Sequence, residues 1–171
     1  GPFLTSLVCL WFVRSRAVVP FCLAMAAVGF LDGLDGAVAR ASGRVTRFGS
    51  YLDAVCDRYV EVLVALSVAS VTGYWALSLV ALSGALLVSY AKARAAMEVA
   101  VSNLEWPDLM ERTERGLLFG AGLAAGSVIP WRPAGHDLFW WTLALLALLT
   151  HLTVLQRVLR ARRFIRERAT R

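Results

Sequence analysis

The sequence has few charged residues and few cysteines or histidines. Charged residues make up 18% of its 171 residues and apolar residues 58%, whereas soluble domains are about 45–50% apolar. This composition excludes a disordered chain and a soluble nucleic-acid-binding domain. The three cysteines have no CxxC spacing and lie in apolar stretches, which excludes a disulfide-stapled secreted module. His136 and His151 are isolated, and we assign them no site.

Apolar runs of membrane length dominate the rest of the chain. The longest, 59–91, contains one charged residue, Glu61, and as a single helix it would exceed a bilayer core of about 30 Å. The Thr72-Gly73 pair predicts a break into two membrane spans. With the runs 1–13, 17–31, 116–131 and 138–155, this predicts an all-α integral membrane protein of six transmembrane helices, with 1–171 as one domain and the first span cut short by the start of the chain.

The basic residues divide unevenly between the two sides of this six-helix arrangement. Arg14, Arg16 and Arg132 lie on one side, and the other 15 of the 18 lysines and arginines lie on the opposite side. Positive charge accumulates in cytoplasmic loops, so we expect a multi-pass protein of the cell membrane with both termini in the cytoplasm. The net charge of +6 then faces anionic lipid headgroups rather than nucleic acid. We interpret the arginines after Arg157 as ordinary anchors of this kind.

Two pairs of glycines, Gly116 with Gly120 and Gly122 with Gly126, are spaced four residues apart. Small residues at this spacing allow two helices to pack closely. The pattern predicts close packing inside one bundle, and a dimer face is the alternative.

Four of the twelve acidic residues, all aspartates, lie between residues 32 and 57. Asp32 and Asp35 are three residues apart and Asp53 and Asp57 are four apart, so each pair shares one face of a helix. Two such helices joined by a loop near Gly43 would run antiparallel and bring the four carboxylates together. Unpaired carboxylates at a membrane boundary repel each other and are costly to desolvate. Divalent cations would relieve that repulsion, and an all-oxygen ligand set favours Mg²⁺, Mn²⁺ or Ca²⁺ over zinc.

The alternative is four solvated acids at helix ends, and the neighbouring glycines argue against it. Gly33, Gly36 and Gly49 lie in or beside these helices, where each costs about 1 kcal/mol relative to alanine. Glycine permits a ligand to approach the backbone closely. Arg40, one turn beyond Gly36, adds a cation suited to phosphate.

This segment resembles the signature of the CDP-alcohol phosphotransferase family, DxxDGxxARx8GxxxDxxxD. The resemblance implies a six-helix bundle with a cytoplasm-facing polar cavity. It also implies transfer of a substituted phosphate from a CDP-alcohol to an acceptor hydroxyl, with release of CMP. Two Mg²⁺ ions, with Mn²⁺ as an alternative, would be bound by Asp32, Asp35, Asp53 and Asp57. Asp57 would be the general base, and Gly36, Arg40 and Thr46 would contact the CDP moiety.

Two further segments, 89–95 and 111–115, look like those of the phosphatidylinositol-phosphate synthase branch of the family. In that branch a basic pocket holds the phosphate of inositol 1-phosphate, and the matching residues are Lys92, Arg115 and Arg157. The resemblance thus implies a CDP-lipid donor carrying diacylglycerol or archaeol, and inositol 1-phosphate as acceptor. We also expect a homodimer. Positive-inside anchoring is the alternative for these cations.

Two rival functions remain open at this point. The same chemistry could use glycerol 3-phosphate, serine or a soluble inositol phosphate as acceptor. A cation transporter would explain the intramembrane acids, although not the glycines or Arg40. The loop 98–110 is longer than in the bacterial synthases, and the family's N-terminal cytidine-binding segment is absent, as expected for a truncated first span.

Overall fold

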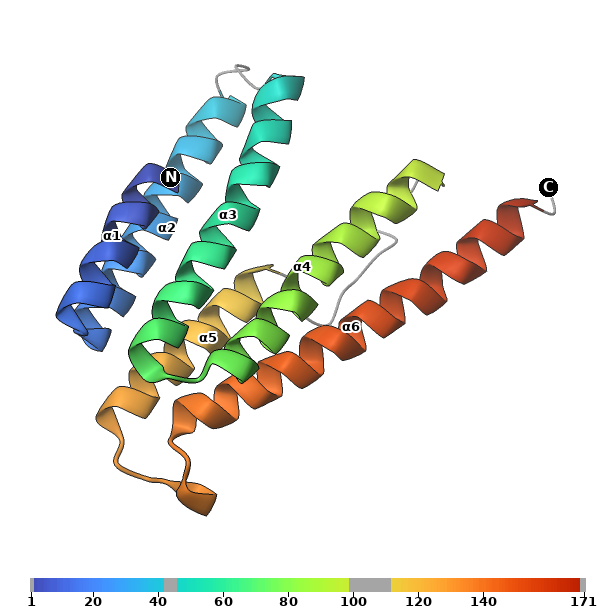
Figure 1. Cartoon of the computed structure of the whole chain (residues 1–171). Helices are drawn as coiled ribbons and strands as arrows, with labels where there is room; N and C mark the ends of the chain where they lie inside the picture. The colour runs from blue at the N-terminus through green and yellow to red at the C-terminus, as the bar shows by residue number, and fades with distance from the viewer. Residues whose placement is uncertain (1, 42–45, 99–111, 170–171) are drawn as a thin grey trace. The chain divides into compact units, whose positions relative to one another are not determined.

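The computed structural model describes residues 2–41, 46–98 and 112–169 (Figure 1). Every regular element in these ranges is a helix, which confirms the all-α prediction. The elements are α1 (Pro2–Ser15), α2 (Val18–Ala41), α3 (Arg47–Thr72), α4 (Trp75–Glu98), α5 (Arg112–Val128), the short 3-10 helix η2 (Pro133–Gly135) and α6 (Leu138–Ala169).

Three of these helices are long and apolar enough to cross a membrane. They are α2 over Val18–Val38, α4 over Trp75–Glu98 and α6 over Leu138–Arg166, and α1 contributes a shorter apolar helix, Phe3–Ser15. Helix α3 carries charged side chains in its first half, and α5 has 17 residues. The chain is therefore a membrane protein, and the count of six spans stays a prediction.

The chain forms two compact units, residues 1–78 and 79–171. In the first unit, α1 contacts both α2 and α3. The rings of Phe12 and Phe21 stack with their centroids 4.0 Å apart across the α1–α2 turn, and Cys9 and Val68 are buried. Helix α1 is thus the element that holds α2 and α3, and with them the acidic segment, in one structure.

The break predicted at Thr72-Gly73 is present. Helix α3 ends at Thr72, and Gly73 has a φ of +78° while its N–H donates to the carbonyl of Ala69. Glycine adopts this left-handed conformation without the steric cost that other residues incur, and it commonly ends helices in this way. The long apolar run is divided here because its sequence supplies the residue that such a turn requires.

In the second unit, glycines allow the helices to approach closely. A Cβ added to Gly84 of α4 would lie 2.2 Å from Oγ1 of Thr150 on α6, and one added to Gly122 would lie 2.2 Å from Oγ1 of Thr142. At Gly126 it would lie 2.7 Å from the backbone nitrogen of Phe139. These contacts confirm the packing role predicted for Gly122 and Gly126.

Replacing Gly126 by alanine is expected to lower the unfolding temperature of the purified protein. The new methyl group would press on the α6 backbone, and overpacking of this kind typically costs 1–3 kcal/mol. Gly116→Ala is the matched control on the same helix, because no described atom lies within 4 Å of its Cβ position. Alanine's higher helix propensity should leave that variant as stable as the parent or more so. Equal unfolding temperatures for the two variants would contradict the packing role.

Several serine and threonine hydroxyls in the helices bond to their own backbone. Ser67 Oγ donates to Leu63, and Thr150 Oγ1 donates to Leu146, each to the carbonyl four residues earlier. A buried hydroxyl without a partner is costly in an apolar medium, and this local bond removes that cost. The same pattern is found at Ser70, Thr72, Thr142 and Thr153.

Candidate active site

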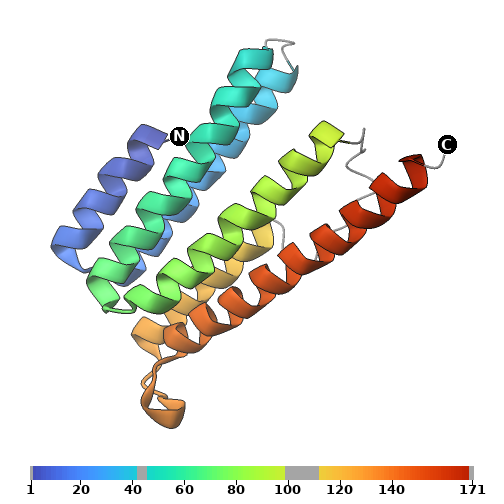
Figure 2. The same cartoon turned by 45° about the vertical axis from the view of Figure 1, so that its right-hand side comes forward.

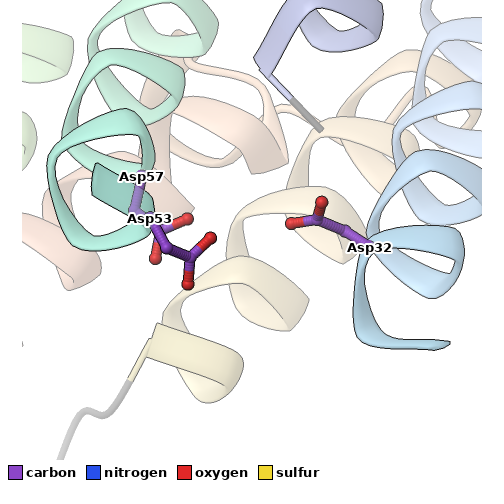
Figure 3. A group of neighbouring side chains, drawn as sticks. All are labelled: Asp32, Asp53 and Asp57. Atoms are coloured by element: carbon purple, nitrogen blue, oxygen red, sulfur yellow. The ribbon is translucent and has the colours of Figure 1, made fainter. Parts of the chain in front are cut away.

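Three of the four predicted metal ligands lie together. Asp32 comes from α2, and Asp53 and Asp57 come from successive turns of α3 (Figure 3). One carboxylate oxygen from each lies within 4.8 Å of the others, and none of the three residues is fully buried. In Figure 3 the Asp32 carboxylate points from α2 toward the two carboxylates of α3. The predicted convergence of the two helices is therefore present in the first unit.

The chemistry of this cluster suits a divalent cation. Two carboxylates about 5 Å apart repel each other by about 3 kcal/mol at an effective dielectric of 20, and the described cluster contains three. Carboxylate oxygens are the ligands preferred by hard cations such as Mg²⁺, Mn²⁺ and Ca²⁺. Asp32, Asp53 and Asp57 thus fit a divalent metal by charge, donor atom and spacing.

The remaining motif residues of α2 lie on the same helix as Asp32. The backbones of Asp35 and Arg40 are helical, but their side chains are outside the described part of the structure. Gly36 is half-buried on α2, and no described atom lies within 4 Å of a Cβ built on Gly33. Packing within the described chain therefore does not require glycine at 33, which fits the expectation that a ligand approaches the backbone there.

Thr46 begins α3 and caps it. Its backbone is extended and its Oγ1 accepts a hydrogen bond from the N–H of Gly49 at 3.0 Å. A Cβ on Gly49 would lie 2.9 Å from that hydroxyl oxygen, so the motif glycine leaves room for the cap. The hydroxyl can also donate its proton to an acceptor such as a phosphate oxygen. This capping role was not predicted from the sequence, although threonine is a preferred N-cap residue.

Glu61 continues the acidic face of α3 but forms an ion pair. Nη1 of Arg58 donates to Oε2 of Glu61 at 2.9 Å, and both side chains are partly buried. Opposite charges three residues apart on a helix commonly pair in this way. Glu61 is therefore partly neutralised by its neighbour.

The three predicted acceptor-binding cations all lie in the second unit. Lys92 of α4 is half-buried, whereas Arg115 of α5 and Arg157 of α6 are only 7% and 5% exposed. Nη1 of Arg157 donates to the backbone carbonyl of Val88 on α4. Charged groups are rarely buried without a purpose in a membrane protein. Arg115 and Arg157 thus differ from ordinary surface anchors, a distinction that the sequence alone did not reveal.

Comparison with known proteins identifies the family. The profile of the CDP-alcohol phosphatidyltransferases matches residues 2–152. The chain belongs to this family. An archaetidylinositol phosphate synthase of Methanothermobacter thermautotrophicus is 35% identical over 151 residues, which cover 85% of this chain and 71% of that protein. A synthase of the same name from Pyrococcus horikoshii is 36% identical over 107 residues, or 61% of this chain and 54% of its own length.

Solved structures of a CDP-alcohol phosphatidyltransferase have the same fold. The phosphatidylinositol phosphate synthase of Mycobacterium tuberculosis with bound CDP-DAG is 25% identical and matches with a TM-score of 0.81, covering 94% of this chain and 82% of that one. The same enzyme has also been solved with manganese and citrate. The family resemblance inferred from the motif is therefore confirmed, and this chain is a membrane transferase of phospholipid biosynthesis.

Proposed function

We propose that this protein transfers a phosphatidyl-type group from a CDP-lipid to a hydroxyl of inositol 1-phosphate and releases CMP. The observation that carries the proposal is the convergence of Asp32, Asp53 and Asp57 in a chain of the CDP-alcohol phosphatidyltransferase family. The relatives named as inositol phosphate synthases support the acceptor. Family membership also argues against the cation transporter.

The donor would bind at the acidic segment of the first unit. Asp32, Asp35, Asp53 and Asp57 would hold divalent metal, which when bound offsets the charge of the pyrophosphate and of departing CMP. Gly36, Arg40 and Thr46 would contact the CDP moiety. Asp57 would accept the proton of the acceptor hydroxyl as its oxygen attacks the lipid-bearing phosphorus. The bond between that phosphorus and the CMP oxygen then breaks, and the proton resides on Asp57.

The acceptor phosphate would be held by Lys92, Arg115 and Arg157. Arginine pairs with phosphate through two parallel hydrogen bonds, and Arg157 is already oriented by its bond to Val88. The burial of Arg115 and Arg157 supports this role, because a partly desolvated cation binds an anion more strongly than a hydrated one. A basic pocket suits an acceptor that is itself a phosphate monoester.

An acceptor panel tests this function directly. Purified protein would be given CDP-diacylglycerol or CDP-archaeol with inositol 1-phosphate, glycerol 3-phosphate, serine or free inositol, and CMP release and the lipid product would be measured. We expect inositol 1-phosphate to give the highest kcat/KM. A preference for another acceptor would overturn the acceptor assignment. If no acceptor in the panel leads to CMP release, the proposed transfer reaction is overturned.

Arg115→Gln is expected to raise the KM for inositol 1-phosphate by roughly 10- to 100-fold. A charge-assisted hydrogen bond contributes about 1.5–3 kcal/mol, and about 1.4 kcal/mol corresponds to one factor of ten. The KM for the CDP-lipid should change little. Arg94→Gln is the matched control, since Arg94 is exposed and pairs with Glu98 at 2.6 Å. Arg115→Lys keeps the charge and should recover part of the loss. A rise confined to the CDP-lipid KM would show that the cation serves the donor.

We also propose the membrane arrangement that the charge distribution favours. Both termini and the active site would face the cytoplasm from the cell membrane, and the protein would act as a homodimer in which residues 1–171 form one transmembrane domain. The excess of lysine and arginine on one side supports the orientation. Labelling of single cysteines placed at Arg14 and Arg163 from each side of sealed vesicles would test it.

A further inference from the structure

Helix α6 is longer than a membrane is thick. Its 32 residues, Leu138–Ala169, form one continuous ribbon (Figure 2). At 1.5 Å per residue the helix measures about 48 Å, against about 30 Å for the hydrocarbon core. One or both of its ends must therefore extend into the headgroup layer or beyond it.

The apolar outer face of α6 indicates which part lies in hydrocarbon. Exposed large side chains recur every three or four residues along it, from 41% to 57% exposed. The stripe measures about 27 Å, close to the thickness of the hydrocarbon core. The opposite face, with Leu143, Leu146 and Thr153, is buried in the second unit. The residues of the outer stripe are Trp141, Leu145, Leu148, Leu152, Leu155 and Leu159.

The same outer face changes from apolar to basic directly after Leu159. Arg162 and Arg166 follow it by three and seven residues, and so continue the stripe by helical periodicity. Both are exposed, as is the adjacent Arg163. Beyond Gln156 the sequence holds seven arginines and one acid, Glu167. The change from leucine to arginine therefore falls where the hydrocarbon core would end.

We propose that the end of α6 carrying Arg162, Arg163 and Arg166 is a docking surface for anionic lipid headgroups. Headgroup phosphates would lie at this level along the stripe, and arginine binds phosphate oxygens in a bidentate manner. Each basic residue near an anionic membrane surface contributes about a fivefold gain in binding. This surface is outside the proposed donor and acceptor sites and does not depend on the transfer reaction. It would also fix the depth at which Arg157 lies.

Lipid titration followed by native mass spectrometry tests the proposal. The full chain in neutral detergent would be titrated with phosphatidylglycerol and, separately, with phosphatidylcholine, without metal, CDP-lipid or inositol phosphate. The wild type is expected to bind phosphatidylglycerol more tightly than phosphatidylcholine. In the triple variant R162Q/R163Q/R166Q, phosphatidylglycerol binding should weaken by about 100-fold, because three fivefold contributions multiply. Phosphatidylcholine binding should not change.

The charge-preserving variant R162K/R163K/R166K is the matched control and should keep most of the phosphatidylglycerol affinity. If the triple glutamine variant has a lowered unfolding temperature, the three single glutamine variants are measured in its place. Each single variant is expected to lose about fivefold in phosphatidylglycerol affinity. Equal phosphatidylglycerol affinity in wild type and glutamine variants would overturn the proposal. So would equal affinity of the wild type for the two lipids. Because no substrate is present, neither result depends on whether the protein carries out the proposed transfer.

Discussion

Removing divalent metal is expected to stop CMP release by the purified protein, and adding Mg²⁺ or Mn²⁺ should restore it. The carboxylates of Asp32, Asp53 and Asp57 lie within 4.8 Å of one another, and a pyrophosphate donor brings more negative charge to them. Such a site can hold its donor only when cations offset the repulsion. The measurement is CMP release from CDP-diacylglycerol in excess EDTA and then over a graded series of each metal. Full activity in EDTA would show that the cluster does not work through metal.

The variant Asp32→Asn tests the same point without chelator. Losing one carboxylate should weaken Mn²⁺ binding, measured by calorimetry, and should lower turnover by more than about 100-fold, since metal contributes several kcal/mol to such reactions. Asp137→Asn is the matched control. Asp137 begins α6 by accepting the N–H of Trp140 at 2.8 Å, and asparagine caps helices about as well. A loss of Mn²⁺ binding in both variants would indicate general damage by aspartate removal.

Asp57→Asn is expected to lower kcat by about 10²–10⁴-fold, the usual cost of losing a general base. The amide oxygen of asparagine can still contact a cation, but asparagine cannot take the proton of the attacking hydroxyl. The CDP-lipid KM should therefore stay near its original value. Rates would be measured at saturating Mn²⁺, with bound metal counted by electron paramagnetic resonance.

Asp53→Asn provides the comparison for that experiment, because Asp53 lies one turn earlier on the same face of α3. In this proposal Asp53 binds metal but does not accept the proton. Replacing it should therefore weaken metal binding and CDP-lipid binding together. Near-normal turnover of Asp57→Asn with metal bound would place the general base elsewhere. If both variants change kcat, metal affinity and the CDP-lipid KM in the same proportions, the two residues do not have distinct roles.

Much of the fold follows from the pattern of apolar residues, but the ends of the helices do not. The Thr72-Gly73 break was predictable because glycine is the residue that a left-handed helix end favours. From hydropathy, the second membrane span was predicted to end at residue 31 and the last span at residue 155. In the structure, α2 continues to Ala41 and α6 to Ala169. Apolar content marks the part of a helix that meets lipid, whereas backbone hydrogen bonds continue through the polar turns beyond it.

The acidic site was predictable from spacing, and the burial of single residues was not. Asp53 and Asp57 share a helix face whether that face is buried or exposed. Their convergence with Asp32 could therefore be predicted once the two helices were expected to lie side by side. A cation such as Arg157 follows the same sequence pattern whether it faces lipid headgroups or the protein interior. The glycine pairs at 116/120 and 122/126 likewise have identical spacing, and only the structure shows that the second pair contacts α6.

Hydroxyls that bond to their own helix limit the hydrogen bonds that can form between helices of the second unit. A threonine such as Thr150, whose proton is already given to Leu146, has no proton left to donate to a neighbouring helix. The attraction between such a threonine and the facing helix then comes from dispersion forces, which weaken markedly when a gap of about 0.5–1 Å opens. Arg157 adds a polar link to Val88, but the close approaches at Gly84, Gly122 and Gly126 supply the fit. At these three positions evolutionary drift is therefore constrained by side-chain volume.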